Sequence, residues 1–260
     1  MNYFRTVSNY AKWLLGVFFH LLVSNTSLAT VQPLIWNLER LEEVRIVPSD
    51  YSIYKNCMSA ANGFVTSPPV VVTNKIKSFA PDPHYYSSIA TYWWPDPNNP
   101  RGKYIRKDGR INPETNEYDL KRIRDLVKRT RCLSFAYYWT GEQKYYDAYI
   151  KQLRAWFIDK ETYMYPNMEF SQVMIGHNGN KGRGAGLVEA YNFIDVLESL
   201  QLVKLVTPIE EEVYDGVKAW FEDFLSWLQN SEIGKKERKE VLHRNAVMPA
   251  SCRASRRSLK

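Results

Sequence analysis

The feature that most constrains this chain is a helical pattern of apolar residues that runs through its second half. From Glu117 onward, apolar side chains recur at steps of three and four residues, which places them on one face of an α-helix. Gly141 interrupts the pattern and suits the left-handed conformation that ends a helix. The sequence therefore predicts two helical hairpins in an all-α fold. The four predicted helices cover about 117–140, 142–157, 187–205 and 208–234.

The fourth segment carries signals for both of its ends. Thr207, Pro208 and Glu210 fit a capping box with a first-turn proline, and Gly234 is expected to end the helix. Because this helix is the last with a helical pattern, we expect its apolar stripe to stay uncovered and the chain to self-associate. The stripe consists of Trp220, Phe221, Phe224, Trp227 and Leu228. The basic residues of the first segment, Lys121, Arg122, Lys128 and Arg129, are expected to face solvent.

The chain before the hairpins gives weaker signals. Residues 36–46 have a loose helical spacing that Pro48 should stop, and Val70 to Val72 form a short β-like run. Residues 1–29 have the three parts of a secretory signal peptide: Arg5 and Lys12, an apolar run, and small residues around Ala29. We expect cleavage near Thr30 and a secreted or periplasmic product without a membrane span; an uncleaved signal anchor is the alternative.

The segment 84–114 is dense in aromatic, basic and proline residues. Its prolines, at 95, 97, 100 and 113, lack a backbone donor and fix φ, so no regular helix or strand is expected there. A long loop of this kind is usually functional or disordered, and its aromatic content argues against disorder. The aromatic residues either pin the loop to the core or line a ligand site.

Several blocks in this region, in their order and spacing, resemble the alginate lyase family. They are His84-Tyr85-Tyr86-Ser87, Tyr92-Trp93-Trp94-Pro95-Asp96-Pro97, Tyr104 to Gly109, Asn112-Pro113-Glu114, Asn167 to Gln172 and Gly182-Arg183-Gly184. The resemblance extends from roughly Pro69 to Lys239. It implies an incomplete (α/α) toroid built of helical hairpins and β-elimination on a polyuronate.

Beyond Lys239 the sequence departs from the family. The family's Asn-His pair and its later Arg and Tyr, which carry the catalysis, are not recognisable in 240–260. His243 and Asn245 stand in a different order, so no catalytic role is transferred to them. We expect a signal peptide (1–29), a lyase-like domain (30–239) and an atypical basic tail (240–260). A truncated or frame-shifted product, without turnover on alginate, is favoured over a genuine tail.

The remaining motif residues suit recognition of an acidic sugar chain. Aromatic faces can stack on pyranose rings, Arg and Lys can pair with uronate carboxylates, and amides can bind hydroxyls. Structural roles are open for His84, for Asn167 and for the tryptophans. The candidate substrate-binding residues are His84, Tyr92, Trp93, Trp94, Arg106, Lys107, Asn167, Gln172, His177 and Arg183.

Charge and cysteines limit the other possibilities. The formal net charge is +7, and residues 235–260 hold nine basic and two acidic residues. The excess positive charge therefore lies in this final segment, and the rest of the chain is neutral. Nucleic acid is for this reason not an expected partner. No metal or cofactor motif is present. Cys57 and Cys132 can pair or remain buried thiols. Alternatives to a lyase are a non-catalytic saccharide-binding remnant and a glycoside hydrolase that uses Asp96 and Asp108.

Overall fold

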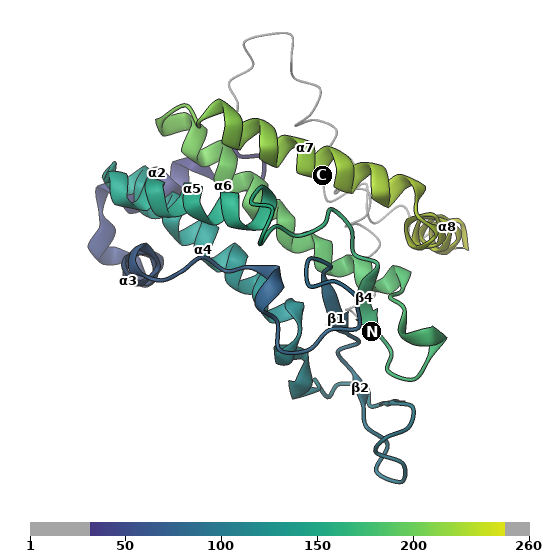
Figure 1. Cartoon of the computed structure of the whole chain (residues 1–260). Coiled ribbons are helices and arrows are strands. Elements are labelled where there is room, and N and C mark those ends of the chain that lie inside the picture. Colours follow the sequence, from purple (N-terminus) through teal and green to yellow (C-terminus); the bar gives the residue numbers. More distant parts are fainter. Residues whose placement is uncertain (1–31, 248–260) are drawn as a thin grey trace.

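The computed structural model describes residues 32–247, with side chains for residues 32–240. Most of this part is helical, and two small sheets lie beside the helices (Figure 1). The mainly helical expectation is therefore confirmed, although strands are added to it. The helices are α2 (Leu38–Ile46), α3 (Ser52–Thr66), α4 (Asp119–Thr140), α5 (Gln143–Phe157), α6 (Asn192–Val206), α7 (Glu211–Asn230) and α8 (Glu232–Val247).

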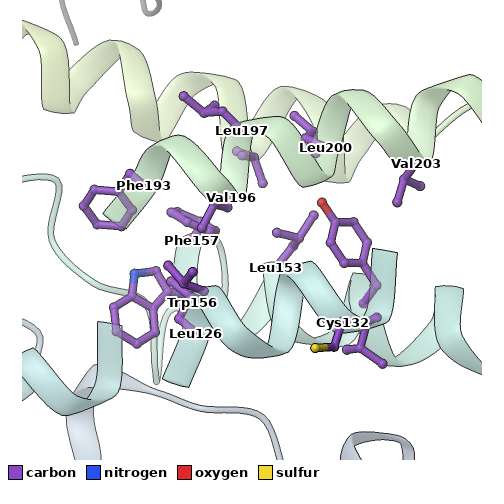
Figure 2. Packing of buried hydrophobic residues seen from close by; sticks show 14 of the residues in the cluster. Leu126, Cys132, Leu153, Trp156, Phe157, Phe193, Val196, Leu197, Leu200 and Val203 are labelled. Atoms are coloured by element: carbon purple, nitrogen blue, oxygen red, sulfur yellow. The ribbon is translucent and has the colours of Figure 1, made fainter. Parts of the chain in front are cut away.

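Helix α4 is the centre of the packing. It contacts α3, α5 and α6, while α7 packs on α5 and α8 on α7. Figure 2 shows apolar side chains from α4, α5 and α6 directed toward one another, among them Leu126, Trp156 and Val196. Burial of side chains of this size is the main stabilising contribution, at about 1.5–3 kcal/mol for each large residue. The predicted amphipathic faces therefore meet in one core.

The apolar stripe of α7 is covered, so the prediction that it stays exposed was wrong. Trp220, Phe221 and Phe224 are 4%, 2% and 0% exposed. Their rings surround Phe193 of α6, with centroid distances of 5.2, 5.8 and 5.5 Å. Trp227 and Leu228 are half-buried and pack against the same core. A short connection folds α7 back onto α5 and α6, which cover the stripe that the linear sequence leaves without a partner.

The helix ends agree with the sequence at one hairpin and differ at the other. Gly141 ends α4 in the left-handed conformation, with φ +69°, as predicted. The capping box is wrong, because α7 begins at Glu211 without a side-chain cap. Glu210 instead pairs with Arg154 of α5 at 3.0 Å. Gly234 lies inside α8 rather than ending α7; a Cβ there would stand 1.9 Å from the Leu228 carbonyl oxygen.

The N-terminal part was predicted incompletely. Helix α2 matches the expectation, and Pro48 follows its end, but α3 was missed. The β-like run at 70–72 is wrong, because Val72 is buried as the first residue of a 3-10 helix, Val72–Asn74. The helix predicted from 187 begins as a 3-10 segment, Gly184–Tyr191, and becomes α-helical at Asn192.

One predicted solvent-facing cation is buried. Arg129 of α4 is 3% exposed and donates to the carbonyl oxygens of Phe64, Ser67 and Pro68 at the C-terminus of α3. The last carbonyls of a helix lack partners within it and carry partial negative charge, so a guanidinium fits there. Burial lowers the Arg129 pKa. This contact holds α3 against α4.

Two small sheets occupy the region where no strand was expected. Strand β1 (Ser87–Ile89) pairs in parallel with β4 (Phe170–Val173), and β2 (Trp93–Trp94) pairs antiparallel with β3 (Ile105–Arg106). The prolines at 95, 97 and 100 lie in the connection between β2 and β3. They therefore flank the strands instead of interrupting them, which is why the argument from proline failed.

Parts of two predictions fall outside the described residues. The predicted signal peptide, 1–29, and the final residues, 248–260, are not described, and neither are the side chains of His243 and Asn245. Helix α8 continues past Lys239 to Val247. Among the helices within 32–247, none is long and apolar enough to cross a bilayer.

Candidate functional site

The β1–β4 pair brings together two motif segments that are about 80 residues apart in the chain. Ser87 is in register with Phe170, and the Ala90 amide donates to the Val173 carbonyl oxygen at 2.9 Å. Only backbone atoms make this pairing, so neither motif alone could predict it. The strands lie close together near one end of α4 (Figure 1). The pairing thereby places the residues that directly follow β1 beside those at the end of β4.

The β2–β3 hairpin contacts the segment that follows β4. The Tyr104 amide donates to the Ile175 carbonyl oxygen at 3.0 Å, and His177 Nε2 donates to the Tyr104 carbonyl oxygen at 2.9 Å. The rings of Trp93 and His177 meet edge to face, with centroids 4.8 Å apart. Two of the predicted binding residues, Trp93 and His177, are therefore in direct contact.

Gln172 and Arg183 form a second contact between predicted residues. Arg183 Nη2 donates to Gln172 Oε1 at 2.8 Å, while the buried Arg183 Nε has no hydrogen-bond partner among the described residues. Burial lowers the Arg183 pKa, nearby Glu189 opposes this effect, and Arg106 adds to it. The two guanidinium groups are thus near enough to interact. Glu189 and Glu237 offset part of the Arg183 charge and Asp108 pairs with Arg106, while the two guanidinium groups together favour an anionic ligand.

The backbone at Gln172 adopts an unusual conformation. Its φ is +49°, in the left-handed region that a residue with a side chain rarely occupies. The backbone amide of Gln172 donates to Ser88 Oγ at 2.8 Å, and Ser88 Oγ in turn donates to the carboxyl group of Glu189 at 2.6 Å. Strained residues of this kind persist only when their surroundings hold them, and they cluster at functional sites.

Glu189 is the buried residue that holds this arrangement, and the sequence did not single it out. It is 4% exposed and also accepts a hydrogen bond from the Tyr86 hydroxyl at 2.8 Å. Burial raises the Glu189 pKa, which the hydrogen bonds from Ser88 and Tyr86 oppose. The available signal was a single acidic residue within an apolar helical run, which is too common to indicate a role.

A second buried acid joins β1 to α4. Asp119 Oδ2 accepts from the Ser87 amide at 2.8 Å and lies 3.3 Å from Lys75 Nζ. Burial raises the Asp119 pKa to about 7, against the opposing effect of Lys75, and burial also lowers the Lys75 pKa. Lys75 further donates to the carbonyl oxygens of Val72 and Pro83 at 2.7 and 2.5 Å. These bonds fix the loop that precedes β1.

His84 and Asn167 make contacts that suit structural roles. His84 Nδ1 donates to the Tyr163 carbonyl oxygen at 2.6 Å, and its ring stacks on Tyr165 at 5.1 Å. Asn167 Oδ1 accepts from the Glu169 amide at 3.3 Å. His84 precedes β1 and Asn167 precedes β4 in the chain. By contrast, Trp93 follows β1, and His177 and Arg183 follow β4. The structure therefore does not bring His84 and Asn167 into contact with the Arg183 pair.

The remaining predicted residues hold the hairpin together. Trp94 Nε1 donates to the Arg110 carbonyl oxygen at 2.8 Å, and Lys107 Nζ lies 5.5 Å from the centre of a Trp94 ring. The Lys107 amide donates to the Tyr92 carbonyl oxygen at 2.8 Å. Arg106 is exposed and pairs with Asp108 at 2.6 Å. A surface pair of this kind contributes about 0–1 kcal/mol, so Arg106 can exchange Asp108 for another anion.

The two aspartates considered for glycosidic hydrolysis have other partners. Asp96 Oδ1 accepts from the Asn98 amide at 2.9 Å, as in an Asx turn, and Asp108 pairs with Arg106. Both therefore have local roles, and the contacts give the hydrolase alternative no support. In the part of the chain that the structure describes, no three His, Cys, Asp or Glu side chains are grouped as metal ligands would be.

The sequence comparison decides the family. A profile of the alginate lyase family matches residues 71–245, which is most of the chain. The chain belongs to the alginate lyase family. The match contains every candidate binding residue, and it extends slightly beyond the end that the motifs indicated. A search of curated proteins found no matching sequence.

A solved structure supports this family assignment. The crystal structure of an alginate lyase from Bacteroides ovatus has a TM-score of 0.71 and 31% sequence identity to this chain. The match covers 82% of this chain and 56% of that lyase. This member of the alginate lyase family therefore spans little more than half the length of the solved relative that it matches.

Proposed function

We propose that this protein is a polysaccharide lyase for a polyuronate such as alginate, whose cleavage proceeds by β-elimination, and that the residues assigned here recognise the substrate while the base and the acid of the reaction remain unassigned in this chain. Family membership gives the reaction class, and the Arg183–Gln172 pair supports an acidic substrate. We further propose that the helices form part of an (α/α) toroid and that the protein acts outside the cytoplasm. The residues within 32–240 would supply the substrate-recognising part of the site.

The reaction explains why a buried cation is needed. A base removes the proton from C5 of the uronate, the C4–O4 bond breaks, a C4–C5 double bond forms, and an acid protonates the departing O4. The negative charge that develops at C5 spreads onto the attached carboxylate, so a positive group at that carboxylate lowers the barrier. We propose that Arg183 binds this carboxylate and that Gln172 orients the guanidinium.

The observation that carries the proposal is the incomplete hydrogen bonding of Arg183. Its guanidinium is half-buried, its Nη2 is held by a neutral amide, and its buried Nε has no partner in the described residues. A guanidinium can bind a carboxylate through two parallel bonds, which a buried charge needs in order to offset its desolvation. Arg183 and the His177 amide both contact Met174, and the His177 ring contacts Trp93, which offers a ring for an adjacent sugar.

The test compares Arg183→Ala with Lys181→Ala, which removes an exposed positive charge from the same loop. Binding of saturated alginate oligosaccharides is measured by calorimetry, with a neutral oligosaccharide of the same length as the ligand control. We expect Arg183→Ala to weaken binding tenfold or more, since a hydrogen bond to a charged group contributes about 1.5–3 kcal/mol. Lys181→Ala should bind nearly as well as the wild type, and Arg183→Lys should fall between.

The outcomes separate the candidate functions. Accumulation of unsaturated uronate, followed by ultraviolet absorbance, would show lyase activity. Binding without this product would indicate a saccharide-binding protein without turnover, and new reducing ends without unsaturation would indicate a hydrolase. Equal binding of the alginate and neutral oligosaccharides, unaffected by Arg183→Ala in a folded variant, would contradict the proposed recognition. Circular dichroism checks folding in each variant.

A further inference from the structure

Two cysteines meet inside the helical layer. Cys57 lies on α3 and Cys132 on α4, 75 residues later, and they are 6% and 5% exposed. Their sulfur atoms are 2.7 Å apart. A disulfide bond measures about 2.0 Å, so a shift of well under 1 Å would join them. This separation is also closer than two thiols that are not bonded normally approach.

The contact does not depend on the cysteines alone. On one side, Arg129 of α4 binds the last carbonyls of α3, at Phe64 and Ser67. On the other, the Tyr145 hydroxyl of α5 donates to Asn62 of α3 at 2.8 Å. These hydrogen bonds fix the position of α3 against its neighbours. The sulfurs therefore face each other in a helix packing that other residues already determine.

The surroundings favour the reactive form of the cysteines. The two sulfurs share a hydrogen bond, and the positive charges of Arg131 and Lys128 lower the pKa of both thiols against the effect of burial. The thiolate is the reactive form in thiol–disulfide exchange, so these charges favour reaction of the pair.

We propose that Cys57 and Cys132 form a disulfide bond that fastens α3 to α4. The thiolate of one of the two cysteines attacks a small or protein disulfide oxidant and releases one thiolate of that oxidant. The sulfur of the other cysteine then attacks the first cysteine's sulfur, and the second thiol of the oxidant leaves with the remaining proton. Two electrons pass to the oxidant in total. Because both sulfurs are buried, the reaction occurs before α3 has packed or when it opens.

The test uses Cys252→Ser, which leaves only these two thiols in the whole chain. The protein is refolded with oxidised glutathione, denatured in guanidinium with an alkylating reagent, and analysed by intact mass. We expect no alkylation and a mass lower by two hydrogen atoms, with two alkyl groups added only after reduction. Two alkyl groups without reduction, or glutathione retained on either cysteine, would overturn the proposal.

A stability measurement provides a second readout. A disulfide that closes a loop of this length should raise the melting temperature of the oxidised chain by on the order of 10 °C over the reduced chain. In Cys57→Ala and Cys132→Ala, made in the Cys252→Ser background, the reductant should have no such effect. Peptide mapping should find the peptides of α3 and α4 joined. A reductant effect of equal size in the single variants would contradict the assignment.

Discussion

The helical layer and the strand region of this protein are stabilised by different kinds of interaction. In the helices α4–α7, apolar side chains make up most of the core, and aromatic rings cluster around Phe193. Their buried polar side chains, such as Arg129, Gln152 and Glu198, bind backbone atoms of the segments before α4. In the strand region, which holds β1 to β4 and the loops that join them, buried charged groups make the connections. Asp119 and Glu189 are the two acids that hold β1 in place.

This difference explains where function resides. Apolar packing tolerates many sequences of suitable size and specifies the position of a helix, not that of a single polar atom. The Asp119 carboxyl group accepts from the Ser87 backbone amide, and Ser88, which itself donates to the Glu189 carboxyl group, accepts from the Gln172 backbone amide. Such hydrogen bonds fix individual backbone amides within narrow limits. The strand region therefore has the precision that substrate recognition requires, and the helical layer supports it.

The largest effect is expected from removing a central side chain of the helical layer. Phe193→Ala should lower the free energy of unfolding by about 3–5 kcal/mol, because the ring is fully buried among four other aromatic rings. The melting temperature should fall by about 10 °C. The matched control is Ile111→Ala in the loop, where the side chain is 65% exposed and the change should stay within about 0.5 kcal/mol.

Denaturant titration of both variants measures this difference. Binding of alginate oligosaccharides, expressed per folded molecule, should be unchanged in Phe193→Ala. A variant that keeps its stability, or that loses binding while fully folded, would mean that the two regions are not separable in this way.

A pH-dependent effect is expected where the two regions join. Folded Asp119 has a pKa raised to about 7 by burial, whereas an unfolded aspartate titrates near about 3.9. At a pH between these two pKa values, Asp119 is more protonated in the folded state than in the unfolded state. The contribution of Asp119 to the free energy of unfolding is therefore fully present below pH about 4 and is lost as the pH rises through about 7. The slope is at most about 1.4 kcal/mol per pH unit.

Asp119→Asn removes this titration. The wild type should therefore lose stability relative to the variant as the pH rises from about 4 to about 7, which thermal melts in buffers of equal ionic strength would measure. A difference between the two proteins that stays constant over this range would show that the buried carboxyl group does not titrate as stated.

The smallest effect is expected at the hairpin. Trp93→Ala and Trp94→Ala should each weaken binding of alginate oligosaccharides by about 1 kcal/mol, or roughly fivefold, through loss of a stacking face. Helical circular dichroism should remain, because β2 is outside the helical core. If both variants melt far earlier and bind normally per folded molecule, the tryptophans serve only to hold the loop.

The sequence was informative wherever a local rule governs the structure. Apolar spacing predicted the helices α4, α5 and α7, and the left-handed preference of glycine predicted the end of α4 at Gly141. The ordered motif blocks predicted the alginate lyase family, which the profile match confirms. These features depend on residues that are close in the chain, and such patterns can be read without knowing the fold.

Only the tertiary structure decided which distant groups meet. The β1–β4 pairing is made by backbone atoms, which every residue carries, so no side-chain pattern indicates it. Glu189, Asp119 and Arg129 were unremarkable in the sequence, yet each is buried with partners from another segment. Glu210 does not take part in the predicted capping box, because it pairs with Arg154 of the neighbouring helix α5. The sequence indicated the family and the helices α2, α4, α5 and α7, whereas the contacts between distant segments determined the strands, which charged groups are buried and which remain for a ligand.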